Sequence, residues 1–154
     1  MDDPVETYLR ATVHADVPAL LGTLAPGASL SSPLVGGAVF REPEDLGILF
    51  GAVYEILRDL RWEEHYRDGR MHTVLGRARV LGAELHDAML LETDADGRVL
   101  TIRPHLRPWT GLSAFAIALA PRLTRHPGVL RRAGRAPTAP PGREKGAIPT
   151  QDRD

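Results

Sequence analysis

Residues 58–97, RDLRWEEHYRDGRMHTVLGRARVLGAELHDAMLLETDADG, decide the fold of this chain. Apolar and polar residues alternate with a period of two through this stretch, and Asp68-Gly69, Gly82 and Asp94–Gly97 interrupt the alternation. This pattern predicts consecutive antiparallel strands joined by tight turns. The residues before it repeat apolar side chains at helical spacing instead. Helices followed by such strands predict an α+β domain in which a curved sheet folds over the helices and encloses a one-ended pocket.

Three helices are predicted ahead of the sheet. The first begins at Pro4 behind an aspartate cap, and the second begins near Pro18 and stops at Pro26. The third begins at Pro43 and is the longest amphipathic helix in the chain. A short strand is predicted at 28–35, between the second and third helices.

The alternation also assigns faces to the strands. In the first strand, the inward face carries Leu60, Trp62, Glu64 and Tyr66. In the second strand, one face carries His72, Val74, Gly76, Ala78 and Val80. In the third strand, the inward face carries Leu85, Asp87, Met89 and Leu91. The strand predicted at 98–106 has two mixed faces, so the pattern does not orient it.

The composition is that of one ordinary globular domain. The 154 residues are 43% hydrophobic and 25% charged, which is enough to bury a core. A net charge of −1 predicts no nucleic-acid partner, and the absence of cysteine excludes disulfides and thiolate metal sites. The acidic start Met1–Pro4 differs from a signal peptide, which favours a cytoplasmic protein. No His-Glu-x-x-His spacing or phosphate-binding glycine loop is present, so neither a metal site nor a cofactor is predicted.

Residues 109–123 predict a further helix that is apolar on nearly every side. It is too short to span a bilayer, which needs about 20 apolar residues. The helix is either a lid over the pocket or half of a subunit contact, with a membrane-surface helix as the third alternative. Together with the outer face of the sheet it predicts a homodimer. The domain is predicted to span 1–133, and the proline-rich segment 134–154 is predicted to be disordered.

A family resemblance rests on five segments: Tyr8 with Asp16, APGASLSSPLVG at 25–36, FREPEDL at 40–46, DADGRVL at 94–100 and RPHLRPW at 103–109. With these segments the chain resembles the nuclear transport factor 2-like superfamily, and within it the SnoaL-like polyketide cyclases and the ketosteroid isomerases. The resemblance covers residues 4–123 and implies a cystatin-like, cone-shaped α+β barrel, in which a curved antiparallel or mixed sheet wraps three N-terminal helices. The superfamily hosts isomerases, cyclases, epoxide hydrolases, dehydratases and binding proteins, so the fold specifies no reaction.

The resemblance assigns roles to single residues. Tyr8 falls where steroid isomerases keep the tyrosine that hydrogen-bonds the substrate carbonyl, a role that suits a phenol in an apolar pocket. Ser32 stands where those enzymes carry the aspartate that moves the proton, and a hydroxyl cannot take that proton without a base. Their second acid aligns near Met89, two residues from Asp87 on the same strand face.

Asp87 is the main candidate for proton transfer. It interrupts an otherwise apolar strand face, and burial there predicts a raised pKa suited to acid-base chemistry. The alternatives are an aspartate paired with a neighbouring arginine or with Tyr8, or a strand register that is off by one residue.

The candidates for substrate binding are Ser32, Trp62, Glu64, Tyr66, His72, Met89, Arg103 and His105. Glu64 lies either in the pocket or at the open edge of the sheet. His72 is either a base that titrates near neutral pH or an exposed histidine of a hairpin. Three roles are open for Arg103 and His105: orienting an anion, pairing with Asp87, or holding the C-terminal helix in place.

Two classes of function fit these residues. The first is a cofactor-independent isomerase or cyclase acting on an apolar polyketide-, steroid- or terpenoid-like molecule, with Asp87 moving the proton and Tyr8 donating a hydrogen bond; an epoxide-hydrolase-like activity belongs to the same class. The second is a binding protein or dimeric accessory subunit without chemistry. A second ionisable group within hydrogen-bond reach of Asp87 would favour the enzyme.

Overall fold

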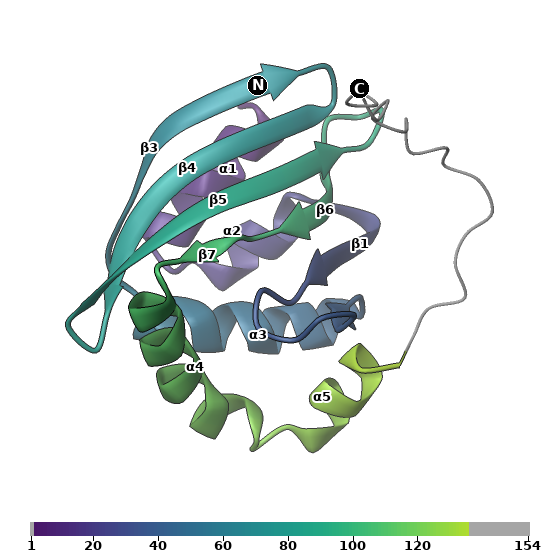
Figure 1. Cartoon of the computed structure of the whole chain (residues 1–154). Coiled ribbons are helices and arrows are strands. Elements are labelled where there is room, and N and C mark those ends of the chain that lie inside the picture. The colour runs from purple at the N-terminus through teal and green to yellow at the C-terminus, as the bar shows by residue number, and fades with distance from the viewer. Residues whose placement is uncertain (1, 136–154) are drawn as a thin grey trace, which may run out of the picture.

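The computed structural model describes residues 2–135, which form five helices and one seven-stranded sheet (Figure 1). The elements, in chain order, are α1 (Pro4–Val13), α2 (Val17–Gly22), β1 (Leu24–Ser31), β2 (Val39–Phe40), α3 (Pro43–Ile56), β3 (Arg58–Asp68), β4 (Met71–Val80), β5 (Ala83–Thr93), β6 (Val99–Arg103), β7 (Leu106–Arg107), α4 (Trp109–Leu123) and α5 (Pro127–Ala133). This order confirms the predicted α+β class.

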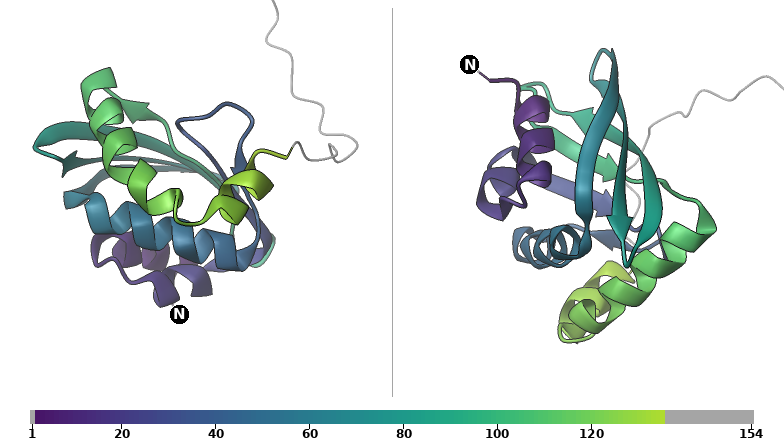
Figure 2. Two further views of the ribbon diagram at one scale, coloured as in Figure 1. Left: turned by 90° about the horizontal axis from the view of Figure 1, so that it is seen from below. Right: turned by 90° about the vertical axis from the view of Figure 1, so that its left-hand side faces the viewer.

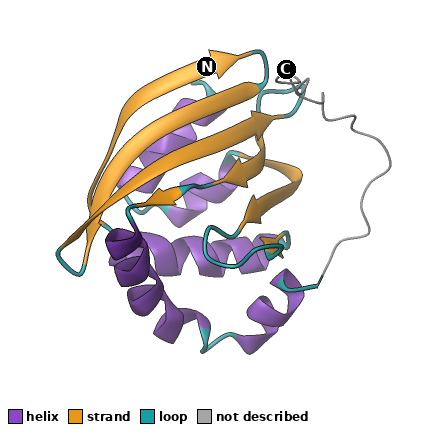
Figure 3. Ribbon diagram, viewed as in Figure 1, coloured by secondary structure: helices purple, strands orange, loops and turns teal. Residues whose placement is uncertain are grey.

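The sheet is curved and mixed. Its strand order is β2-β1-β6-β5-β4-β3, and β7 pairs with β5 beside this path. Only the β1–β6 pair is parallel within the described chain; every other pair is antiparallel. The long strands β3, β4 and β5 bend over α1 and α3, so that the helices fill the concave side of the sheet (Figures 1 and 3). The pocket therefore forms between the concave face and the helices.

The predicted helix starts are confirmed by their caps. The Asp3 carboxylate accepts from the Val5 N–H at 2.8 Å, and the Asp16 carboxylate accepts from the Ala19 N–H at 3.1 Å. Proline occupies the first turn of both helices, where its missing N–H has no intrahelical partner to lose.

The strand predicted at 28–35 is displaced toward the N-terminus. β1 begins at Leu24 and ends at Ser31. It ends there because the Ser32 hydroxyl oxygen accepts from the N–H groups of Leu34 and Val35, each at 3.1 Å, which turns the chain away from the sheet. Residues 32–38 therefore form a loop instead of strand.

The last predicted strand, 98–106, is broken into two. β6 ends at Arg103, because Pro104 has no N–H to continue the ladder, and β7 then pairs with β5. The register shifts between Glu92 and Thr93 of β5, and as a result both Val99 and Ile102 are buried. A strict period of two could not orient this strand, because the strand does not keep that period.

The C-terminal arm consists of α4 and α5, which run beside α3 (Figure 2). The start of α4 packs closely on β5, because a Cβ at Gly111 would collide with the carbonyl oxygen of Glu84. The helix predicted at 109–123 is confirmed, whereas α5 was not predicted. No helix of the described residues is long and apolar enough to cross a membrane.

Two ion pairs hold this arm against α3. Arg132 of α5 donates to both carboxylate oxygens of Asp45, at 2.8 and 2.7 Å, and Arg122 of α4 donates to Glu55 at 3.3 Å. The Arg132 hydrogen bonds lower the pKa of Asp45. Of the predicted disordered segment 134–154, residues from 136 onward lie outside the described residues.

Candidate functional site

A cavity of about 520 Å³ lies between the concave face of the sheet and the helices. Apolar side chains from β1, α3, β3, β5, β6, α4, α5 and the 32–38 loop form nearly all of its wall. The polar side chains that reach it include Tyr8, Ser32, Tyr54 and Asp87. Such a cavity suits a mostly apolar ligand that carries one or two polar groups.

Asp87 projects into this cavity from β5. Its strand partners are Gly76 of β4 and Leu106 of β7, and its inward direction matches the predicted face. Its Oδ1 accepts from the backbone N–H of His105 at 3.1 Å. Burial raises the pKa of Asp87 to about 7, although the hydrogen bond from His105 opposes the shift. Near neutral pH the carboxyl is therefore available both as an acid and as a base.

Two tyrosines, Tyr8 buried and Tyr54 half-buried, lie within electrostatic range of this carboxyl, and within residues 2–135 neither hydroxyl hydrogen-bonds to it. Tyr8 comes from α1 and Tyr54 from α3, and Phe50 lies between their rings, edge-on to Tyr8 at 6.4 Å and stacked on Tyr54 at 6.2 Å. Burial raises the pKa of both hydroxyls, and the charge of Asp87 raises them further. Both therefore remain protonated hydrogen-bond donors at neutral pH.

The two tyrosine hydroxyls also interact with each other, and this interaction raises the pKa of Tyr8 further. The Tyr8 hydroxyl donates to the Met89 sulfur at 3.9 Å, a weak bond that leaves it available to a ligand oxygen. Met89 itself is buried and lines the cavity, as its predicted face requires.

Trp62 of β3 forms one wall of the cavity. Its Nε1–H donates to the Thr12 hydroxyl at 2.8 Å, and Thr12 in turn donates to the Leu9 carbonyl at 2.6 Å, so α1 fixes the indole. The ring lies against Gly76 of β4, where a side chain has no room.

We expect Gly76→Ala to displace Trp62 from the cavity wall. An added Cβ would collide with the indole and approach the Arg61 carbonyl oxygen to 2.8 Å. Overpacking of this kind costs about 1–3 kcal/mol of unfolding free energy, measurable by urea denaturation. The control is Gly51→Ala in α3, because nothing lies within 4 Å of a Cβ there. If both variants unfold at the wild-type urea concentration, Trp62 is not held as described.

The predicted inward positions of Glu64 and Tyr66 are wrong. The β3–β4 register shifts between Trp62 and Glu64, and this β-bulge turns the rest of β3 over. Glu64 and Tyr66 consequently lie on the outer face, exposed, with the Tyr66 hydroxyl donating to the Glu64 carboxylate. A slip of one residue exchanges the two faces of a strand.

The predicted role of His72 in the pocket is also unsupported. His72 is buried on the concave face, but its neighbours are His65 and the charged groups of Asp3 and Arg67, away from the cavity. Its Nδ1 lies 2.8 Å from Nε2 of His65, which the same β-bulge turns inward. Burial, followed by the charges of His65 and Arg67, lowers the pKa of His72.

Arg103 and His105 lie outside the main cavity. Arg103 pairs with Leu90, which faces the outer side of the sheet, so its side chain points away from Asp87. His105 contributes its backbone N–H to Asp87, while its ring nitrogen Nδ1 lies 3.1 Å from the Arg103 carbonyl oxygen. Both residues border a shallower pocket on the outer side.

Ser32, a predicted substrate-binding residue, lines the cavity, but its oxygen already accepts the N–H groups of Leu34 and Val35. Its hydroxyl hydrogen remains available to a ligand. Ser32 therefore shapes the loop and offers one donor, without the means to remove a proton.

Two features of the site were missed from the sequence. Tyr54 follows Phe50 by four residues, so the helical spacing that identified the apolar face of α3 places it beside that face. The wall contributed by α5, including Leu130, had no comparable signal, because α5 has only seven residues. Within residues 2–135, no three histidine or acidic side chains lie close enough together to hold a metal ion.

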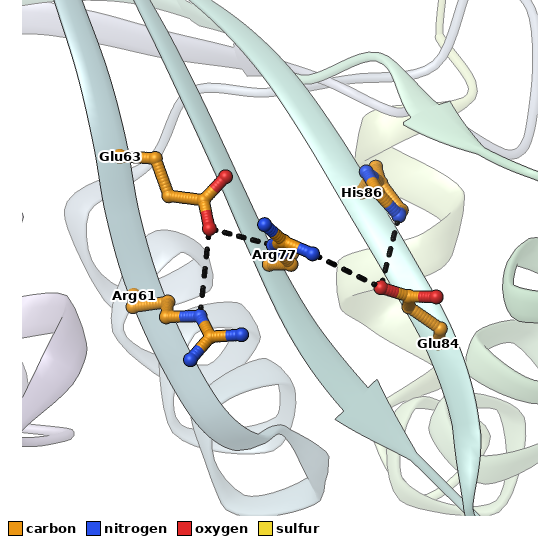
Figure 4. Close-up of polar contacts among 5 residues, drawn as sticks. All are labelled: Arg61, Glu63, Arg77, Glu84 and His86. Atoms are coloured by element: carbon orange, nitrogen blue, oxygen red, sulfur yellow. Dashed lines mark hydrogen bonds and ion pairs between the residues drawn. The ribbon is translucent and has the colours of Figure 1, made fainter.

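The outer face of β3, β4 and β5 carries a ladder of charged side chains (Figure 4). Arg77 donates to Glu63 at 2.6 Å and lies 3.5 Å from Glu84, while Arg61 and His86 extend the ladder at its two ends. This end of the outer face is therefore charged, contrary to the apolar surface on which the predicted homodimer partly rests.

No family model and no curated protein matches this sequence. Among solved structures, an uncharacterised protein from Silicibacter pomeroyi with a cystatin-like fold superposes with a TM-score of 0.78 at 14% identity, over 86% of this chain and 95% of that one. The fold is that of the nuclear transport factor 2-like proteins. This confirms the predicted resemblance at the level of the fold.

Two other structures with this fold are named as enzymes. A steroid delta-isomerase from Pseudomonas aeruginosa has a TM-score of 0.73 at 22% identity, over 81% of this chain and 92% of that one. A putative polyketide cyclase from Sinorhizobium meliloti has a TM-score of 0.54 at 23% identity, over 68% of this chain and 95% of that one. Identities this low show a shared fold, which also carries proteins of unknown function.

Proposed function

We propose that this nuclear transport factor 2-like protein is a cofactor-independent enzyme that moves a proton on a small, largely apolar carbonyl compound. The observation that carries the proposal is a single carboxyl with a pKa near 7, Asp87, within electrostatic range of two protonated tyrosine hydroxyls in an otherwise apolar cavity. Isomerisation or cyclisation of a polyketide-, steroid- or terpenoid-like carbonyl compound can begin with such a proton transfer, and this is the substrate class that we propose.

The proposed step needs nothing beyond these residues and the substrate. The ionised Asp87 carboxylate takes a proton from the carbon next to the carbonyl, and the electrons of the broken C–H bond form an enolate. Tyr8 or Tyr54 donates a hydrogen bond to the enolate oxygen, where negative charge develops. The protonated Asp87 then returns the proton to the same or another carbon, which restores the carboxylate.

Deuterium exchange tests this step without knowledge of the natural substrate. α-Tetralone and androstenedione are apolar ketones of different length with exchangeable protons next to the carbonyl. In D₂O near pH 7 the wild-type protein is expected to accelerate their deuteration over buffer, as followed by mass spectrometry. If the ketones bind but exchange no faster than in buffer, the cavity is a binding site without this chemistry.

We expect Tyr8→Phe to slow the exchange on the order of a hundredfold, as loss of one oxyanion donor typically does. Tyr54→Phe removes the interaction partner of Tyr8 and is expected to cost less, because Tyr8 still donates to the ligand. The control is Tyr66→Phe, which removes an exposed hydroxyl on the outer face. Equal rates in all three variants would exclude a tyrosine oxyanion site.

A homodimer remains a proposal, with the uncharged part of the outer sheet face as its contact. Leu75, Ala88 and Leu90 lie there, only partly covered in the described chain, beyond the charged ladder of Figure 4. Such a dimer would leave the cavity mouth open.

A further inference from the structure

The mouth of the cavity has an apolar rim that faces solvent. Leu34 and Val35 of the 32–38 loop and Leu130 of α5 all line the cavity, yet all three are exposed, with Val35 at 61%. Apolar side chains that border a ligand entrance and also face water are a common sign of an interaction surface.

The exposed face of α4 continues this rim. Ala116 and Ala120 line the cavity, and Ala120 is also exposed. An α-helix advances about 100° per residue, so Trp109, seven residues before Ala116, projects within about 20° of it. Trp109 is 76% exposed and Ile117, next to Ala116, is 67% exposed. The mouth surface, defined here as Leu34, Val35, Trp109, Ile117, Ala120 and Leu130, is therefore apolar on both its loop side and its helix side.

Positive charge is concentrated in the same part of the chain. Residues 97–135 contain eight arginines and no aspartate or glutamate, whereas residues 1–96 contain eight arginines and 17 acidic residues. Two acids of α3 pair with arginines of this arm, Asp45 with Arg132 and Glu55 with Arg122, while Glu44 and the N-cap residue Glu42 lie close enough to Arg132 to raise its pKa.

Three further arginines stand beside the mouth surface in sequence. Arg131 follows Leu130, and Arg125 follows the cavity-lining Thr124. Arg107 precedes Trp109 by two residues, but its strand partner is His86 and it therefore lies on the outer face of the sheet. All three are exposed, and within residues 2–135 none of them makes an ion pair. The surface therefore combines exposed apolar side chains, one of them a tryptophan, with two adjacent arginines, Arg125 and Arg131, that make no ion pair within residues 2–135.

We infer that the mouth surface docks on an anionic lipid bilayer, so that an apolar ligand passes between the membrane and the cavity without crossing water. Apolar side chains buried at the headgroup boundary together with arginines near anionic headgroups are the two contributions that hold interfacial proteins on membranes. Tryptophan favours the same boundary. An acidic protein partner would satisfy the arginines but gives no reason for the apolar rim to surround a ligand entrance. The inference rests on the proposed function only in taking the ligand to be apolar.

Vesicle flotation with the full chain tests the inference. At low salt, the protein is expected to float with vesicles of equal parts phosphatidylcholine and phosphatidylglycerol and to remain behind with phosphatidylcholine alone. Trp109→Ala/Ile117→Ser is expected to lower the partition coefficient at least tenfold, and Arg125→Gln/Arg131→Gln on the order of tenfold or more. The matched control is Arg70→Gln/Arg79→Gln, which removes the same charge from exposed arginines at the two ends of β4.

Emission of Trp109 gives a second readout. It is expected to shift to the blue on addition of the anionic vesicles and to be quenched by brominated acyl chains. Trp62, the other tryptophan, lies in the cavity wall. The part of the emission change that is lost in Trp109→Ala therefore comes from Trp109.

Three results would overturn the inference: no flotation with anionic vesicles at low salt, equal flotation of the Trp109/Ile117 variant and wild type, or a loss of flotation in the Arg70/Arg79 control as large as in the Arg125/Arg131 variant. A wild-type dimer that becomes a monomer by light scattering in the Trp109/Ile117 variant, without vesicle binding, would identify a second copy as the occupant. Asp87→Asn is expected to float like wild type, so a failure of the proposed catalysis is distinguishable from a failure of docking.

Discussion

Asp87→Asn is expected to abolish proton exchange on apolar ketones while leaving their binding nearly unchanged. The carboxylate is the group placed in the cavity to take the proton, and an amide of the same shape cannot do so. General acid-base catalysis typically contributes 10²–10⁴ in rate, so the exchange rate is expected to fall by at least about a hundredfold. The asparagine oxygen still accepts from the His105 N–H, which keeps the strand geometry intact.

Glu64→Gln is the matched control for this prediction. It neutralises a carboxylate on a neighbouring part of the sheet, but one that lies on the outer face. Its exchange rate is expected to equal that of wild type. Full exchange activity in Asp87→Asn would exclude Asp87 as the base.

Asp87→Asn is also expected to stabilise the fold at alkaline pH. Burial raises the pKa of Asp87 from 3.8 to about 7, so the unfolded chain binds fewer protons than the folded one between these values. The contribution of Asp87 to the free energy of unfolding therefore falls as pH rises from about 4 to about 7. At pH 8 the wild type is expected to be less stable than Asp87→Asn by up to about 4 kcal/mol, the free-energy equivalent of that shift.

Urea denaturation of both proteins at several pH values checks this expectation. The difference between them is expected to be largest above pH 7 and to vanish only below the unfolded-state pKa of 3.8, where the carboxyl is protonated in both the folded and the unfolded state. A difference that stays constant with pH, or that makes wild type the more stable protein at pH 8, would show that Asp87 is well solvated.

The fold was predictable because its long elements keep a single period. β4 and β5 keep one unbroken register, Met71–Val80 against Ala83–Glu92, so Asp87 and Met89 were placed on the correct face. β3 does not keep its period. The bulge after Trp62 adds one residue to β3, and nothing in the composition of the strand predicts it. Glu64 and Tyr66 were therefore assigned to the wrong face.

The site was predictable where one residue interrupts a regular pattern, and unpredictable where it depends on packing between distant segments. Asp87 interrupts an apolar face, whereas the burial of His72 beside His65 depends on the bulge in β3. Arg103 and His105 were misplaced because the sequence does not show that Arg103 pairs with the outward-facing Leu90, or that Pro104 ends β6 before His105. Tyr54 could have been predicted to lie beside the apolar face of α3, because it follows Phe50 by four residues.

The carbon-13 NMR titration of aspartate carboxyl groups tests the central claim most directly. With carboxyl-labelled aspartate, one resonance is expected to titrate near pH 7 in the wild type and to be absent from Asp87→Asn, because burial in the cavity raises the pKa of that carboxyl. A spectrum in which every aspartate titrates below pH 5 would contradict the account.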